Sequence, residues 1–257
     1  LLSASGMNCF DMQEMAWALD AAKVRDLQLS WGGLVLGQRL EVYVNAQVRR
    51  KPLEQMAKPF VVVATRLEDG ERTVFARGNT GQAVRASSSV PDVFQPVTIG
   101  KYHFVDGGIV SPVPVDAARQ LGADMVIAVD ISNKARGQTP GDMLGTLGQS
   151  IAIMGQKLGQ AELARADVVI RPQVLDIGSA DFSQRANAIL EGEKAALAVM
   201  PQIRERVAQL QAERAKAARA AQQKAAEAQY QTCLEKRSSL QKLAGMARLD
   251  DSCTAPK

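Results

Sequence analysis

Residues 102–130 read YHFVDGGIVSPVPVDAARQLGADMVIAVD and contain the clearest structural pattern of the chain. A hairpin strand ends at Asp106, and two glycines follow it directly. Residues 115–121 have a helical pattern that closes at Gly122, and the apolar run 125–130 then predicts a buried strand. A strand, a glycine turn, a helix and a second strand at this spacing predict a βαβ unit.

The sequence on either side extends this pattern. Residues 60–65 are wholly apolar and mostly β-branched, which is typical of a strand covered on both faces in a parallel or mixed sheet. The remaining periodic segments predict helices over 9–19, 37–48, 81–88, 142–164 and 182–199, and strands over 72–76, 97–99 and 167–171. The sequence therefore predicts an α/β fold with a mostly parallel central sheet.

Composition limits the class of protein. The chain has 257 residues, of which 46% are hydrophobic and 23% charged, so it is globular rather than disordered. The net charge of +4 lies partly in the C-terminal tail, and aromatic residues make up only 4%, which argues against a nucleic-acid partner. No stretch approaches the roughly 18 apolar residues of a membrane-spanning helix, so we expect none.

The last part of the chain differs in character. After Pro201, residues 203–231 are almost all Ala, Gln, Glu, Lys and Arg, which favours one long helix. Two interpretations stay open, namely a solvated helix or weak coiled-coil segment, and a basic helix on a membrane surface. We therefore expect two parts, a globular domain over residues 1–200 and a helical C-terminal extension over residues 201–257.

The cysteines and the histidine restrict the chemistry. With no C-x-x-C pair and only His103, the sequence predicts no metal site and no cofactor. Cys9, Cys233 and Cys253 are either three free thiols, as in a cytoplasm, or include a Cys233–Cys253 disulfide, as in a periplasm.

Asp106 is the candidate catalytic residue. A carboxylate at a strand end before two glycines is either the cap of an Asp-Gly turn or a catalytic base. A Ser-His-Asp triad would need His103, but residues three apart in a strand point to opposite faces. We therefore expect His103 on the surface of the hairpin, whereas a serine–aspartate dyad needs no imidazole.

Several short motifs together resemble a known family. They are residues 86–91 (ASSSVP), 94–96 (FQP), 105–108 (VDGG), 112–114 (PVP) and 121–124 (LGAD), followed by the strand 126–130. Their order resembles the C-terminal half of a patatin-like phospholipase domain of the bacterial type. The resemblance extends more loosely from Leu1 to about Pro201, and it implies a three-layer α/β sandwich with a C-terminal helical extension.

The resemblance implies a function. Patatin-like enzymes are serine acyl hydrolases that cleave ester bonds of phospholipids and other acyl lipids, without a cofactor. Their dyad pairs a serine in G-x-S-x-G with an aspartate in D-G-G, so Asp106 would be the general base and Gly107 and Gly108 would complete its motif. A lipid substrate and peripheral contact with a membrane surface follow as expectations, whereas substrate-binding residues and oligomeric state do not.

The chain departs from the family in one respect. It contains neither G-x-S-x-G nor a glycine-rich oxyanion loop, and it begins at Leu1 without an initiator Met. Residues 4–7 resemble the end of the helix after the nucleophile, so we expect the missing parts to precede Leu1 and the sheet to be incomplete there. Two hypotheses follow: an acyl hydrolase whose serine segment is absent from this chain, or a non-catalytic lipid-binding or scaffolding relic.

Overall fold

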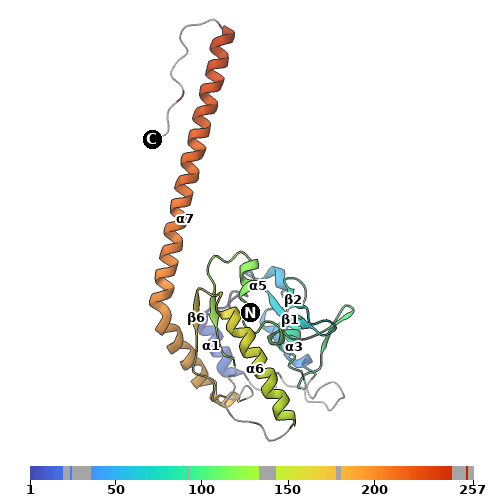
Figure 1. Cartoon of the computed structure of the whole chain (residues 1–257). Coiled ribbons are helices and arrows are strands. Elements are labelled where there is room, and N and C mark those ends of the chain that lie inside the picture. The colour runs from blue at the N-terminus through green and yellow to red at the C-terminus, as the bar shows by residue number, and fades with distance from the viewer. Residues whose placement is uncertain are drawn as a thin grey trace. The chain divides into compact units, whose positions relative to one another are not determined.

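The computed structural model describes residues 1–19, 24, 36–91, 93–132, 143–177, 181–244 and 253. The chain divides into two compact units, Leu1–Met200 and Pro201–Lys257. The first unit contains every described strand, and the second consists of the larger part of one long helix, α7 (Arg185–Ala244), with Cys253 beyond it (Figure 1).

A four-stranded sheet forms one half of the first unit. Its strands are β1 (Val62–Arg66), β2 (Arg72–Phe75), β3 (Val97–Ile99) and β4 (Tyr102–Asp106). They lie in the order β2-β1-β4-β3, and every neighbouring pair is antiparallel. The expectation of a mostly parallel sheet is wrong here, because the short connections at Asp69-Gly70 and Gly100-Lys101 can join only antiparallel strands.

A separate pair of strands supplies the parallel part. β5 (Ile127–Val129) pairs in parallel with β6 (Val168–Ile170), and α6 (Met143–Leu163) lies between them in the chain. A parallel pair needs such a crossover connection. The α/β class is therefore confirmed, whereas a parallel arrangement is found in this pair alone among the described strands.

Helices pack against the four-stranded sheet and against one another. The remaining elements are α1 (Cys9–Ala18), α3 (Gln38–Gln47), η1 (Leu53–Gln55), α4 (Thr80–Ser87), η2 (Gly107–Ile109), α5 (Val115–Gln120) and η3 (Phe182–Gln184). α3 packs on α4, and α4 packs on β1 and β4. The two helices approach closely at Gly81, whose amide donates a hydrogen bond to Asn45 Oδ1 at 2.9 Å.

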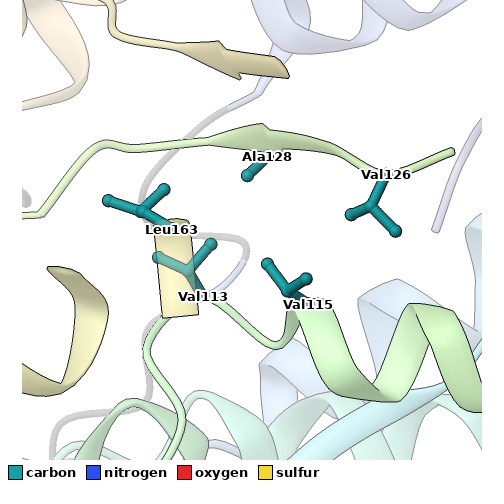
Figure 2. Packing of buried hydrophobic residues seen from close by; sticks show 5 residues of the cluster. All are labelled: Val113, Val115, Val126, Ala128 and Leu163. Atoms are coloured by element: carbon teal, nitrogen blue, oxygen red, sulfur yellow. The ribbon is translucent and has the colours of Figure 1, made fainter. Parts of the chain in front are cut away.

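One hydrophobic cluster packs the β5 segment against α5 and α6, and another packs the four-stranded sheet against α4. In Figure 2, Val113 and Val115 point from the segment that enters α5 toward Val126 and Ala128 of the β5 segment, and Leu163 of α6 completes the cluster. The other cluster lies under the four-stranded sheet and consists of Ala64, Ala86, Val97 and Phe104, with the ring of Phe75 edge-on to that of Phe104 at 5.1 Å between centroids.

The helix α7 runs without interruption through Pro201. We expected a boundary at this proline, which removes one backbone hydrogen bond and ordinarily ends or kinks a helix. Strong helix formers on both sides sustain the helix here, and most side chains beyond Pro201 are exposed. Cys233 is paired with Cys253 in a disulfide with 6.0 Å between Cα atoms, whereas Cys9 is a free, exposed thiol.

Within the described part of the chain, no helix combines the length and the apolar character that crossing a membrane requires.

The α3–α4 contact yields a first prediction. A Cβ on Gly81 would lie 2.4 Å from the carbonyl oxygen of Glu41 and 2.6 Å from the Asn45 side chain, so Gly81→Ala must push the helices apart. We expect it to lower the free energy of unfolding by about 1–3 kcal/mol, measured by urea denaturation with tryptophan fluorescence.

Gly148 of α6 is the matched control, because a Cβ there meets nothing within 4 Å. Gly148→Ala should leave stability unchanged or raise it by up to about 1 kcal/mol, through helix propensity alone. Equal effects of the two alanines would contradict the close approach of α3 and α4.

Candidate active site

Asp106 is fixed at the end of β4 by contacts with two other segments. It is paired with Ala64 across the β1–β4 ladder. Its amide donates to the Ser89 carbonyl at 2.9 Å, and its carbonyl accepts from the hydroxyl of the buried Thr65 at 2.7 Å. The backbone that presents the carboxylate is therefore held from β1 and from the end of α4.

The two glycines after Asp106 have different structural roles. Gly107 is buried, and a Cβ there would lie 2.3 Å from the carbonyl oxygen of Val63, so only glycine fits against β1. The Gly108 amide donates to Asp106 Oδ1 at 2.6 Å. One glycine thus allows the strand to turn, and the next orients the carboxylate.

The surroundings of Asp106 favour a proton acceptor. Burial raises the pKa of the carboxyl, and the hydrogen bond from the Gly108 amide opposes that rise. No Lys, Arg or His forms an ion pair with Asp106 in the described ranges. A carboxylate with a raised pKa is a stronger base than an ordinary aspartate, which suits general-base chemistry.

Asp106 borders a cavity of about 570 Å³. Most of its lining is apolar and comes from β1, α4, α5 and the segments that lead into β1 and α5; it includes Phe60, Val62, Val84, Pro112 and Leu121. Ser87, Ser88 and Ser111 also line it, but within the described residues no serine hydroxyl is hydrogen-bonded to the Asp106 carboxylate. The cavity offers an apolar volume with one carboxylate at its wall.

Comparisons with known proteins match this part of the chain. Residues 1–119, which include Asp106, Gly107 and Gly108, fit the family model for patatin-like phospholipase. Over these residues the chain is similar to the patatin-like phospholipases. The suspected family resemblance is therefore confirmed.

The relatives are longer proteins. An uncharacterised NTE family protein of Mycobacterium tuberculosis is 30% identical over 115 residues, which cover 45% of this chain and 32% of the relative. Another from the same organism is 26% identical over 200 residues, covering 68% of this chain and 34% of the relative. Patatin-like phospholipase domain-containing protein 7 of Mus musculus is 29% identical over 86 residues, which cover 33% of this chain and 6% of the relative. The chain spans about a third of the length of the first of these curated relatives.

Glu162 supports the patatin-like motif from outside the matched region. This α6 residue is only 6% exposed, and its two oxygens accept hydrogen bonds from the Ser111 hydroxyl and, at 2.8 Å, from the Val113 amide. The Ser111 amide in turn donates to the carbonyl of Gly107 at 2.9 Å. α6 thereby holds the loop that follows D-G-G.

Sequence reasoning missed Glu162, and no signal could have shown it. A glutamate in a long helix is ordinarily solvated, and helical periodicity does not reveal that this one faces a loop about 50 residues earlier in the chain.

His103 lies apart from the cavity. It pairs with Thr98 in the β3–β4 hairpin, is exposed, and its Nδ1 lies 2.8 Å from Glu68 Oε1. The structure therefore does not bring His103 together with Asp106. Within the described residues, no group of three His, Cys, Asp or Glu side chains could hold a metal ion.

The Glu162 contacts yield a second prediction. Glu162→Ala leaves the buried Ser111 hydroxyl and Val113 amide without acceptors, so we expect unfolding to require about 3 kcal/mol less free energy. Glu162→Gln should cost about 1 kcal/mol or less, because the amide can accept from Val113 while it donates to Ser111. Urea denaturation measures both.

Glu193 provides the comparison, because it is an exposed glutamate in the part of α7 that belongs to the first unit. Glu193→Ala should change stability by no more than about 0.5 kcal/mol. If Glu162→Ala were equally mild, Glu162 would not support the loop.

The raised pKa of Asp106 yields a third prediction. The pKa of Asp106 is raised in the folded protein relative to its value of about 3.9 in the unfolded chain. The folded protein therefore holds the Asp106 proton more tightly than the unfolded chain does. This contribution to stability is fully present below about pH 3.9 and is lost as pH rises through the folded-state pKa. Asp106→Asn does not ionise, so its stability relative to wild type should increase between about pH 4 and neutrality. Urea unfolding of both proteins across this range measures the difference, and a gap independent of pH would refute the raised pKa.

Proposed function

We propose that this chain is part of a serine acyl hydrolase that cleaves the acyl esters of phospholipids or related lipids, with Asp106 as the base of a Ser-Asp dyad. The observation behind the proposal is the Asp106 carboxylate, which has a raised pKa and stands at the wall of an apolar cavity of about 570 Å³. The similarity of residues 1–119 to the patatin-like phospholipases supports the same reaction class. We assign the hydrolase part to residues 1–200 and the helical extension to 201–257.

The proposed chemistry has two steps. A serine hydroxyl attacks the ester carbonyl carbon and Asp106 accepts its proton; Asp106 then passes this proton to the leaving alcohol while the serine keeps the acyl group. Asp106 next removes a proton from the water that attacks the acyl-enzyme, and it returns that proton to the serine oxygen as the fatty acid leaves. The serine lies outside these 257 residues, which contain no G-x-S-x-G.

The geometry around Asp106 suits this role. Oδ1 accepts a hydrogen bond from the Gly108 amide, and no donor among the described residues is hydrogen-bonded to Oδ2, so one oxygen can receive the serine proton. The apolar lining suits an acyl chain, because burial of each methylene contributes about 0.8 kcal/mol.

A second candidate is a non-catalytic lipid-binding or scaffolding protein. The observation in its favour is that the Asp106 carboxylate has no hydroxyl partner in the described structure, as a dyad would require. The cavity could then hold a lipid without cleaving it.

Ester hydrolysis separates the two candidates. We expect the 257-residue chain to show no turnover of p-nitrophenyl butyrate. We expect a longer protein, which also carries any residues encoded before Leu1, to hydrolyse this ester. In that longer protein Asp106→Asn should lower kcat by about 10²–10⁴-fold, the usual contribution of general-base catalysis.

Asp176→Asn is the control, since this aspartate is exposed and outside the cavity. Turnover by the longer protein that survives Asp106→Asn would refute the dyad, and absence of turnover in both proteins would favour lipid binding.

We also propose that the protein works in an oxidising compartment, such as a periplasm. The support is the Cys233–Cys253 pair, because disulfides persist mainly where thiols are not kept reduced. Alkylation of the denatured, unreduced protein from its native source should modify Cys9 alone, whereas modification of all three cysteines would contradict the proposal.

A further inference from the structure

A cluster of four exposed cations lies at the end of α3 and just before β1. Arg49, Arg50 and Lys51 follow the helix directly, and Lys58 comes seven residues later; together they are called the basic turn. None of the four forms an ion pair among the described residues. The positive charge of the basic turn is therefore not neutralised by an ion pair among the described residues.

The backbone of the basic turn is strained. Arg49 has a φ of 53° and Arg50 a φ of 57°, and these are the non-glycine residues with positive φ in the described structure. Glycine adopts this left-handed region without penalty, whereas a residue with a side chain does not. Arginines at two successive left-handed positions point to a use for their side chains, since strain of this kind gathers at functional sites.

The turn is also held in place. Val48 and Leu53, on either side of residues 49–51, are buried, and the hydroxyl of buried Thr80 donates to the Lys51 carbonyl at 2.7 Å. The Arg50 amide donates to the Asn45 carbonyl at 2.6 Å. The cations are thus displayed on a fixed backbone rather than on a free loop.

The dipole of α3 explains part of the concentration of cations at its C-terminus. A cation near the C-terminus of α3 interacts favourably with the helix dipole. That effect is confined to the last turn, so it does not account for Lys58, which lies beyond η1. The acidic groups nearby are engaged elsewhere, because Asp11 accepts from Asn8 Nδ2 and Glu54 accepts from the Gly78 amide.

The N-terminal segment links the basic turn to the cavity. Arg49 and Lys51 border a hollow of about 300 Å³ together with Ser5, Gly6 and Met7. Lys58 Nζ donates to the Ser3 hydroxyl at 3.2 Å. Leu1 and Pro59, next to these residues, line the Asp106 cavity.

We propose that the basic turn binds the anionic headgroups of a lipid bilayer and holds the first unit on the membrane surface. The choice of a lipid surface over other polyanions rests on the proposed function, which needs access to acyl lipids. Each cationic side chain within a Debye length of an anionic membrane strengthens the membrane-binding constant about fivefold.

Vesicle sedimentation tests the proposal on the full 257-residue chain. The probes are vesicles of phosphatidylcholine alone and vesicles that also contain phosphatidylglycerol. We expect binding to the anionic vesicles only, with a decrease as salt increases, and about thirtyfold weaker binding for Arg49→Gln/Arg50→Gln.

Two further variants separate charge from folding. Arg49→Gly/Arg50→Gly removes the charges and relieves the backbone, so it should lose binding as the glutamine variant does while remaining at least as stable as wild type. Arg49→Lys/Arg50→Lys keeps the charges and should keep the binding. The control is Lys216→Gln/Arg219→Gln on α7, which removes the same charge from exposed positions and should bind as wild type does.

Each other outcome overturns the proposal. These are equal binding to neutral and anionic vesicles, no binding to either, wild-type binding by the glutamine and glycine variants, or loss of binding in the α7 control. Duplex DNA that competes as well as anionic vesicles would show a general polyanion site instead. Vesicle binding requires no turnover, so a failed hydrolysis assay leaves this test unaffected.

Discussion

The backbone of Gly107 lies against the Val63 carbonyl so closely that no Cβ fits between them. This contact sets how the end of β4 meets β1, and the Ala64–Asp106 register depends on it. A larger residue would displace the turn from the strand, and with it the Gly108 amide that orients the carboxylate. The position of the candidate base is therefore determined by backbone sterics before any side-chain contact is considered.

Two partly or fully buried carboxylates lie near this turn, and they differ in how many hydrogen-bond donors each one has. Glu162 has a donor for each oxygen and links α6 to the loop after D-G-G. Asp106 has one donor, and burial raises its pKa. A saturated buried carboxylate holds structure, whereas a half-satisfied one borders the cavity and remains able to accept a proton.

Local patterns predicted the elements better than their pairing. The strand before Asp106 and the helix that Gly122 closes both follow from turn chemistry and periodicity, and the structure contains them. The apolar run that became β1 was expected in a parallel or mixed sheet, because burial on both faces is typical of such strands. β1 is buried although antiparallel, since α4 covers it and η2 packs against it, and no local pattern reports that covering.

The residues that support the candidate site extend beyond the family match. The match ends at residue 119, near the end of α5, yet Val113 and Val115 pack on Val126, Ala128 and Leu163, which all follow it. Glu162 likewise acts on Ser111 from beyond that limit. The loop after D-G-G therefore takes its shape from β5 and α6 as much as from its own motif. This explains why a motif can identify the family from a few residues, while the geometry of the cavity depends on packing that the motif does not encode.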